Sequence, residues 1–254
     1  MNLRALTPRK QGEKQIPSPR RGGLGWGEKL WILAAVALIL PACGLLSDTN
    51  DDWPYAQTPI PPNTDDTLTV ITVGDSIAAG WMDCRETICE GIEFDWWQDA
   101  IGGEALVFSR GIGNSTTDDL LENWSRDTAG ADVVIVLTGV NDVARGVDAE
   151  HITANFEQMT ARAHENGITP VISTIMPADT TTPEQQAVVE AVNEFLRSQD
   201  DWLVMDLSSE MSDPDNPGRL RRDEIAHDGS AHPNERGYAR MTAFVRAWWM
   251  ENFP

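Results

Sequence analysis

The chain has 254 residues, with 40 acidic and 19 basic side chains and a formal net charge of −21 at pH 7. Hydrophobic residues make up 41% of it and charged residues 23%, which supports a buried core and excludes a disordered acidic tail. Two acids and seven bases precede Cys43, and the remaining body of 38 acids and 12 bases repels phosphate backbones, so we expect no nucleic-acid partner.

The N-terminal segment has the features of an export signal. Basic residues precede an apolar run of eleven residues, 30–40 (LWILAAVALIL). This run is too short for a membrane-spanning helix, which needs about twenty residues, but it fits a secretory signal. Residues 40–43 (LPAC) resemble a bacterial lipobox, which implies that Cys43 is lipidated. The alternative is an ordinary signal peptide with an incidental cysteine. We predict a signal with a lipobox at residues 1–43 and a lipid-anchored protein of the cell envelope, on its periplasmic or cell-surface side.

Residues 44–66 contain Pro54, Pro59, Pro61 and Pro62 among aspartate, asparagine and threonine. Proline removes backbone donors and blocks helix formation, so this segment is predicted to be an extended tether. A single domain then covers residues 67–254, and the lipid anchor is its only expected membrane contact.

Cys84 and Cys89 are the other two cysteines. Because an exported domain lies in an oxidising compartment, we favour a disulfide between them over a metal site. Two free thiols are the alternative.

The domain alternates between short β-branched runs and amphipathic stretches. Strands are predicted at residues 68–73, 105–109, 133–137, 169–175 and 202–207. Helices are predicted at residues 149–166, after a capping box that begins at Thr182, and at residues 235–251. Nearly continuous apolar strands between helices indicate a parallel sheet covered on both faces, with its site at the carboxyl ends of the strands.

Two polar motifs follow the first two predicted strands. Residues 74–76 (GDS) come directly after strand 68–73, and residues 111–117 (GIGNSTT) follow strand 105–109. A serine on such a turn can present its hydroxyl, and glycines let backbone N–H groups converge on an anion. Alone, each motif also fits an ordinary turn.

Two further motifs complete the set. Residues 139–142 (GVND) end strand 133–137, and residues 228–234 (DGSAHPN) precede the last predicted helix. An asparagine amide can donate to a developing oxyanion. A histidine can accept the proton of a serine when another group orients its second ring nitrogen. Together the four motifs favour a serine nucleophile with an oxyanion loop and a general base.

In this order the motifs resemble those of the SGNH/GDSL hydrolase family, in a bacterial lipoprotein form, over about residues 70–248. The resemblance implies an α/β fold: a three-layer α/β/α sandwich with a flavodoxin-like, five-stranded parallel sheet. It implies that Ser76 is the nucleophile, His232 the general base and Asp228 the acid that orients it. The oxyanion hole would use the backbone N–H groups of Ser76 and Asn114 and the side chain of Asn141.

The chain departs from the family pattern at two positions. Asn114 stands where the family usually has glycine; asparagine retains the backbone N–H and tolerates left-handed dihedrals, although Gly113 could serve instead. Asp228 precedes His232 by four residues, whereas the family usually has three, so a backbone carbonyl or another acid such as Asp223 is the alternative partner.

The function predicted from this resemblance is a serine esterase that hydrolyses carboxylic esters, acyl esters or lysophospholipid-like substrates, through an acyl-enzyme. No cofactor and no metal are expected, and we expect a monomer. One alternative is removal of O-acetyl groups from polysaccharide, because Trp81, Trp96 and Trp97 offer aromatic faces that suit sugars, unless they pack in the core. Another is a non-catalytic extracytoplasmic binding module. The remaining histidines match no motif and are predicted to be surface residues: His151, His164 and His227.

Overall fold

The computed structural model describes residues 60, 67–81, 95–226 and 229–254. The chain divides into the units Met1–Asp48 and Thr49–Pro254, and the first of them lies wholly outside the described residues. Several residues of the sequence predictions also lie outside them: Cys43, Cys84, Cys89, His227 and Asp228. The signal peptide, the lipid anchor, the tether, the disulfide and the acid therefore stay predictions.

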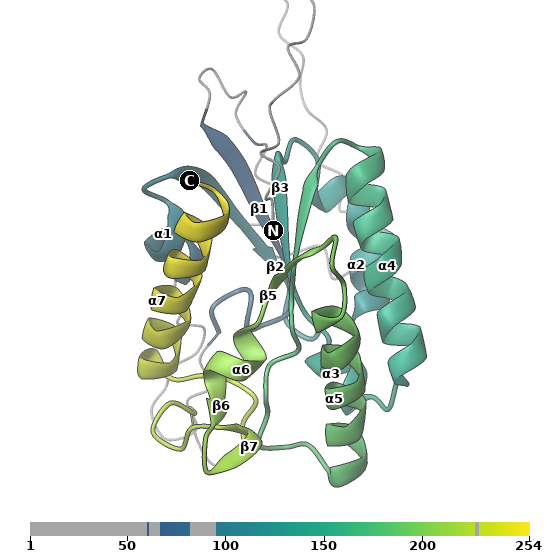
Figure 1. Ribbon diagram of the computed structural model, residues 1–254, viewed down its shortest axis with the longest axis vertical. Helices are drawn as coiled ribbons and strands as arrows, with labels where there is room; N and C mark the ends of the chain where they lie inside the picture. Colours follow the sequence, from purple (N-terminus) through teal and green to yellow (C-terminus); the bar gives the residue numbers. More distant parts are fainter. Residues whose placement is uncertain (1–59, 61–66, 82–94, 227–228) are drawn as a thin grey trace, which may run out of the picture. The chain divides into compact units, whose positions relative to one another are not determined.

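Five parallel strands form the central sheet (Figure 1). They are β1 Leu68–Gly74, β2 Ala105–Gly111, β3 Val133–Leu137, β4 Thr169–Ser173 and β5 Leu203–Met205. Their order is β2-β1-β3-β4-β5, which is the flavodoxin-like order. The predicted fold class is confirmed.

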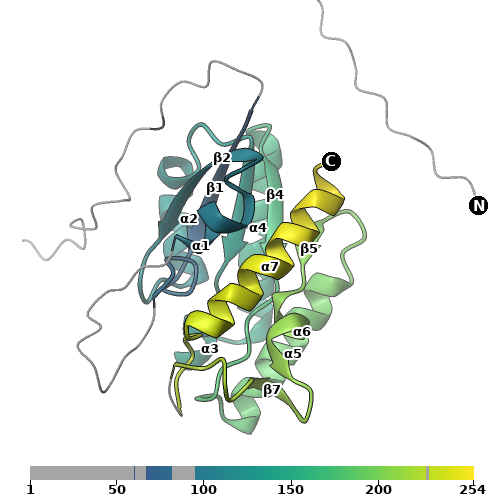
Figure 2. The same cartoon turned by 90° about the vertical axis from the view of Figure 1, so that its left-hand side faces the viewer.

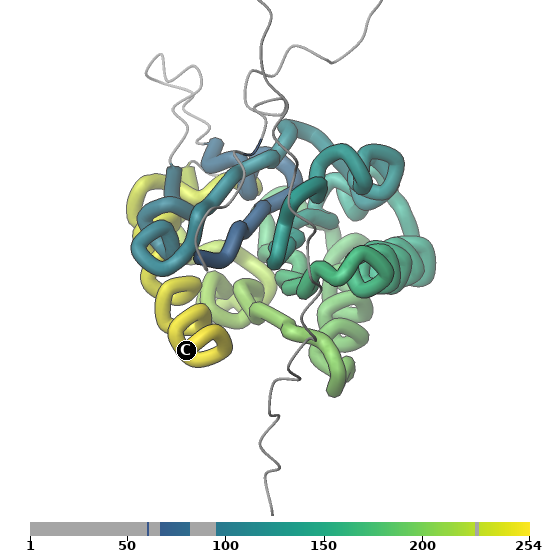
Figure 3. Tube along the Cα trace, turned by 90° about the horizontal axis from the view of Figure 1, so that it is seen from above, coloured from purple at the N-terminus to yellow at the C-terminus, as the bar shows by residue number. Residues whose placement is uncertain are grey.

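Helices cover both faces of this sheet, as the views in Figures 1 and 3 show. The helices are α1 Trp96–Ile101, α2 Thr117–Asp127, α3 Val140–Ala144, α4 Ala149–Glu165, α5 Pro183–Arg197, α6 Leu207–Met211 and α7 Glu235–Asn252. Helices α1 and α7 pack together on one face (Figure 2), and α2, α4 and α5 lie on the other. Among the described helices, none has the length and hydropathy needed to cross a membrane.

The carboxyl ends of three neighbouring strands, β2, β1 and β3, lie side by side. Gly74 of β1 pairs with Gly111 of β2 on one side and with Leu137 of β3 on the other. A Cβ atom on Gly74 would lie 1.9 Å from the Leu137 carbonyl oxygen, so only glycine fits there. This close approach brings three of the predicted motifs to the same edge of the sheet.

Two predicted strands are too long. The strand expected at residues 169–175 ends at Ser173, and the Ile175 N–H donates to the side chain of Asn193 at 2.7 Å instead of continuing the ladder. The strand expected at residues 202–207 is limited to β5, because the side chain of Asp206 caps α6 by accepting from the Ser209 N–H.

The predicted helices agree closely with the structure. Thr182 and Gln185 form the expected capping box, and Pro183 is the first residue of α5. Helix α4 ends at Glu165, one residue early, and α7 ends one residue later than predicted. A two-stranded antiparallel hairpin, β6 Ser212–Asp213 with β7 Asn216–Leu220, was not predicted.

Candidate active site

Ser76 lies on a tightly held turn at the end of β1. The adjacent Asp75 is buried, and its Oδ1 atom accepts a hydrogen bond from the Ile77 N–H at 2.8 Å. Below the turn, the indole N–H of Trp97 donates to the Ala78 carbonyl at 2.9 Å. Backbone and side-chain bonds thus hold the serine from both sides, and Ser76 is 8% exposed.

Two of the three tryptophans that suggested a sugar-binding surface belong to the core. Trp96 and Trp97 are each 1% exposed and stack with their ring centroids 3.7 Å apart. Trp81 is half-buried, and its ring lies near the oxyanion loop, with one ring carbon 4.0 Å from where a Cβ on Gly113 would stand.

The structure brings Ser76 and His232 together across 156 positions of sequence, with 2.8 Å between the serine Oγ and the histidine Nε2. The backbone of His232 is held on both sides: its carbonyl accepts from the Ala226 N–H at 3.0 Å, and its N–H donates to the Ser230 hydroxyl at 2.9 Å. The 2.8 Å separation between the serine Oγ and the histidine Nε2 suits proton transfer from the hydroxyl to the imidazole.

The predicted acid, Asp228, lies outside the described residues. The alternative acid, Asp223, forms an exposed ion pair with Arg236 at 2.7 Å. The backbone carbonyl of Asp223 accepts from the Asn234 side chain at 3.0 Å, so this residue also helps to hold the start of α7.

The predicted oxyanion residues Asn114 and Asn141 lie on neighbouring segments, Asn114 on the loop before α2 and Asn141 in α3. Asn114 has a φ of 63°, the left-handed conformation for which its tolerance was predicted, and no other described residue except glycine has a positive φ. The Asn141 side chain donates to the Ser115 carbonyl at 3.0 Å. An asparagine amide nitrogen carries two hydrogens, so this bond orients the group and leaves a second hydrogen for a ligand. Arg145 donates to the Asn114 carbonyl at 2.8 Å and holds the same loop.

A buried polar network between α2, α3 and α4 was not predicted from the sequence. Asp142 is 0% exposed and accepts from both the N–H and the hydroxyl of Thr117, with the hydroxyl at 2.6 Å. Asn155 of α4 donates to the same hydroxyl at 2.8 Å. The network fixes the start of α2, and hence the end of the loop that carries Asn114, to α3, the helix that carries Asn141. Asp142 belongs to the predicted GVND motif, whereas Asn155 carries no sequence signal of its own.

Burial dominates the electrostatics beneath the serine. It raises the pKa of Asp75 from 3.8 to about 7, and the negative charge of Asp142 adds to the increase. Burial also raises the pKa of Asp142. The pKa of Tyr238 is raised for the same reason, with a smaller effect from Asp75, and its hydroxyl donates to the Trp81 carbonyl at 2.7 Å. The phenol therefore acts as a hydrogen-bond donor that ties α7 to the serine turn.

The two described histidines outside the site are surface residues, as predicted. His164 is exposed, and His151 is exposed beside Asp118, with 2.9 Å between its Nε2 and the carboxylate. Hydrogen bonding to Asp118 raises the pKa of His151. Among the described residues, no group of three or more histidine, cysteine, aspartate or glutamate side chains could hold a metal ion.

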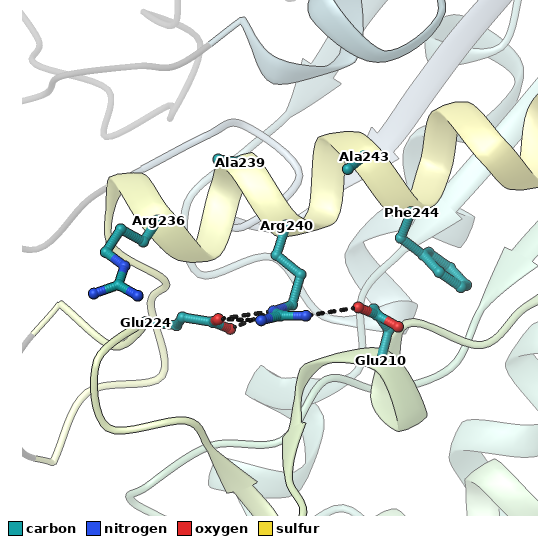
Figure 4. Close-up of a pocket in the computed structure, with 7 residues that line it drawn as sticks. All are labelled: Glu210, Glu224, Arg236, Ala239, Arg240, Ala243 and Phe244. Atoms are coloured by element: carbon teal, nitrogen blue, oxygen red, sulfur yellow. Dashed lines mark hydrogen bonds and ion pairs between the residues drawn. The ribbon is translucent and has the colours of Figure 1, made fainter.

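A surface pocket of about 400 Å³ lies along α7, and neither Ser76 nor His232 lines it (Figure 4). Arg240 crosses it and pairs with the buried Glu224 at 2.7 Å and with Glu210 at 3.1 Å. These ion pairs join α7 to α6 and to the segment before His232. Three of the charged side chains that line the pocket are therefore paired with one another.

A flavodoxin-like α/β/α sandwich with a serine and a histidine hydrogen-bonded at the carboxyl edge of its sheet defines the class of this protein. Residues 72–240 match the model of the GDSL-like Lipase/Acylhydrolase family. This match spans more than half of the chain. The protein belongs to the GDSL-like lipase/acylhydrolase (SGNH) family, a family of hydrolases. No curated protein matches the chain.

Solved structures share the fold. A protein assigned to the lipolytic G-D-S-L family from Desulfitobacterium hafniense aligns with a TM-score of 0.60 and 20% identity, over 72% of this chain and 99% of its own. A protein assigned as an acylhydrolase from Bacteroides fragilis aligns with a TM-score of 0.61 and 20% identity, over 79% and 94%. The lipase/acylhydrolase from Enterococcus faecalis gives 0.59 and 21%, over 73% and 96%. At these identities, the similarity establishes the fold alone.

Proposed function

We propose that this protein is a serine esterase that cleaves carboxylic esters through an acyl-enzyme. The observation that carries the proposal is the 2.8 Å hydrogen bond between Ser76 Oγ and His232 Nε2, at the sheet edge where the oxyanion loops converge. A non-catalytic binding module has no need of this pairing.

In the proposed reaction, Ser76 attacks the ester carbonyl while His232 takes its proton and then passes it to the leaving alcohol. The backbone N–H groups of Ser76 and Asn114 and the second amide hydrogen of Asn141 donate to the oxyanion. Water activated by His232 then attacks the acyl-enzyme, releases the carboxylic acid and restores the serine. Asp228 is proposed to orient the imidazole.

Labelling with a fluorophosphonate tests this proposal, because the reagent needs an activated serine. We expect the wild-type protein to react and Ser76→Ala to lose both labelling and ester hydrolysis while it keeps its fold by circular dichroism. Ser125→Ala, which changes an exposed serine of α2, is the control and should still react. Labelling that persists in Ser76→Ala contradicts the assignment of the nucleophile.

The substrate is proposed to be an acyl ester or a lysophospholipid-like ester. Removal of O-acetyl groups from polysaccharide is the second candidate, and Trp81 beside Gly113 is the contact that supports it. Nitrophenyl esters of short and long chain length, assayed beside acetylated xylan, separate the two. A preference for acetylated xylan that disappears in Trp81→Ala would favour the second candidate, whereas release of long acyl chains favours the first.

The protein is also proposed to be anchored in the cell envelope through lipidated Cys43, with residues 44–66 as a tether. The support is the LPAC sequence after an apolar run. Extraction of the expressed protein should need detergent, and Cys43→Ser should change its fractionation or processing. Identical soluble behaviour of the two forms contradicts lipidation.

A further inference from the structure

We propose that Arg219 is a positioning residue for His232. Arg219 lies in β7 of the β6–β7 hairpin and donates hydrogen bonds to the turn at residues 178–181, which follows β4. This turn is itself hydrogen-bonded to Ser230, two residues before His232. The consequence for catalysis rests on the proposed function of His232 as general base.

The guanidinium of Arg219 gathers three backbone carbonyls of one turn. Its Nη1 donates to the carbonyls of Ala178, at 3.3 Å, and Asp179, and its Nη2 donates to the carbonyl of Thr181 at 3.0 Å. Hydrogen bonds from a charged donor are stronger than those between neutral groups, and the planar fork of arginine fixes their directions. A single side chain therefore supplies donors to three carbonyls of this turn, while the Ala178 carbonyl also accepts from the Thr181 hydroxyl at 2.9 Å.

This turn is connected to the histidine through Ser230, which is 3% exposed. The Asp179 N–H donates to the Ser230 carbonyl at 3.2 Å, and the Ser230 hydroxyl accepts from the His232 N–H at 2.9 Å. From His232 the path continues to the Ser76 hydroxyl at 2.8 Å. Hydrogen bonds between successive residues, linked through the covalent structure of Ser230 and His232, thus join the turn held by Arg219 to Ser76.

The β6–β7 hairpin that carries Arg219 is packed against the core and against α5. Leu220, next to Arg219, is 1% exposed and belongs to the core. At Gly218, where φ is +84°, a Cβ would lie 2.4 Å from the side-chain amide of Gln186 in α5, so the strand packs closely against that helix. Figures 1 and 2 show β7 at the same end of the sheet as the start of α7, the helix that follows His232.

Removal of the guanidinium should therefore shift the imidazole of His232, although Arg219 itself makes no contact with substrate in this proposal. A displacement of about 1 Å at a reacting group can cost about 100-fold in rate. Because the Ala226 bond also holds His232, we expect Arg219→Met to lower kcat by about 10- to 100-fold, with KM within about twofold of wild type. Arg219→Lys keeps the charge but not the fork, and should retain an intermediate kcat.

The experiment measures kcat, KM and the second-order rate constant of fluorophosphonate labelling for the full-length protein, well below the unfolding midpoint of each variant. Arg222→Met is the matched control, because Arg222 is exposed and lies three residues further along the chain. Ser230→Ala removes the acceptor for the His232 N–H and tests the same path if Arg219→Met does not fold. Within each of the variants Arg219→Met and Ser230→Ala, we expect the labelling rate constant and kcat to fall by the same factor. In Arg222→Met both should stay at the wild-type level.

Wild-type kcat and labelling in a folded Arg219→Met protein overturn the proposal, as does a rise in KM alone. If Arg219→Met does not fold, wild-type labelling in Ser230→Ala overturns it. If the wild-type protein does not react with the fluorophosphonate, the proposed esterase activity is wrong. The NMR signals of the His232 ring then test whether Arg219 positions this histidine. A ring shift or pKa that changes in Arg219→Met supports the positioning role, and unchanged signals refute it.

Discussion

Asp75 provides a sharp test of the electrostatics beneath Ser76. This residue is 1% exposed, and burial raises the pKa of its carboxyl group from 3.8 to about 7. Between about pH 4 and pH 7 the folded protein keeps a proton that the unfolded chain has released. The free energy of unfolding therefore falls as the pH rises through this window, and the loss is complete above the folded pKa.

The magnitude follows from the size of the shift. A difference of about three pH units corresponds to about 4 kcal/mol, at about 1.4 kcal/mol per unit. Asp75→Asn keeps an oxygen that can accept from the Ile77 N–H but cannot titrate. We expect the stability of the Asn variant relative to wild type to increase by up to about 4 kcal/mol from pH 4 to pH 8.

Urea unfolding of both proteins at half-unit intervals of pH gives this difference directly. The new amide can add an offset that does not depend on pH, so the slope of the difference is the relevant quantity. Asp99→Asn, at an exposed position of α1, is the control for the loss of one negative charge. Parallel curves for wild type and Asp75→Asn between pH 4 and pH 8 would refute the argument.

Three further predictions concern the site and its surroundings. Asn141→Ala should lower kcat by about 10²- to 10³-fold through the loss of an oxyanion donor, and steady-state ester hydrolysis that is unchanged in a folded variant would rule this role out. Asp228→Asn should lower turnover by at least about 10²-fold if its carboxylate orients His232, whereas activity within about threefold of wild type would show that the histidine works without it. The exported domain should have a mass about two daltons below its reduced value because of a Cys84–Cys89 disulfide, and alkylation of both thiols without reductant would reject the pairing.

The strands could be predicted because a sheet covered on both faces needs nearly continuous apolar residues. All five residues of β3 are buried, and its bounds agree with the prediction. The end of β5 could not be predicted in this way, since Leu207 is apolar like the residues of the strand but belongs to α6. Asp206 decides where β5 ends, because its side chain caps α6 by accepting from the Ser209 N–H and also accepts from Arg197. The periodicity of the strand does not reveal these contacts.

By itself, the sequence determined the order of the four motifs, and the resemblance of that order to a known family selected Ser76 and His232. Three motifs follow β1, β2 and β3, whose carboxyl ends meet at one edge of the parallel sheet, whereas the His232 motif follows the β6–β7 hairpin. Only the tertiary structure decided which groups hold these residues in place. Asn155, Ser230 and Arg219 act through backbone carbonyls, hydroxyls and amides of distant segments. Such partners are present in every residue or are common along a chain, so only their approach in the folded protein distinguishes them.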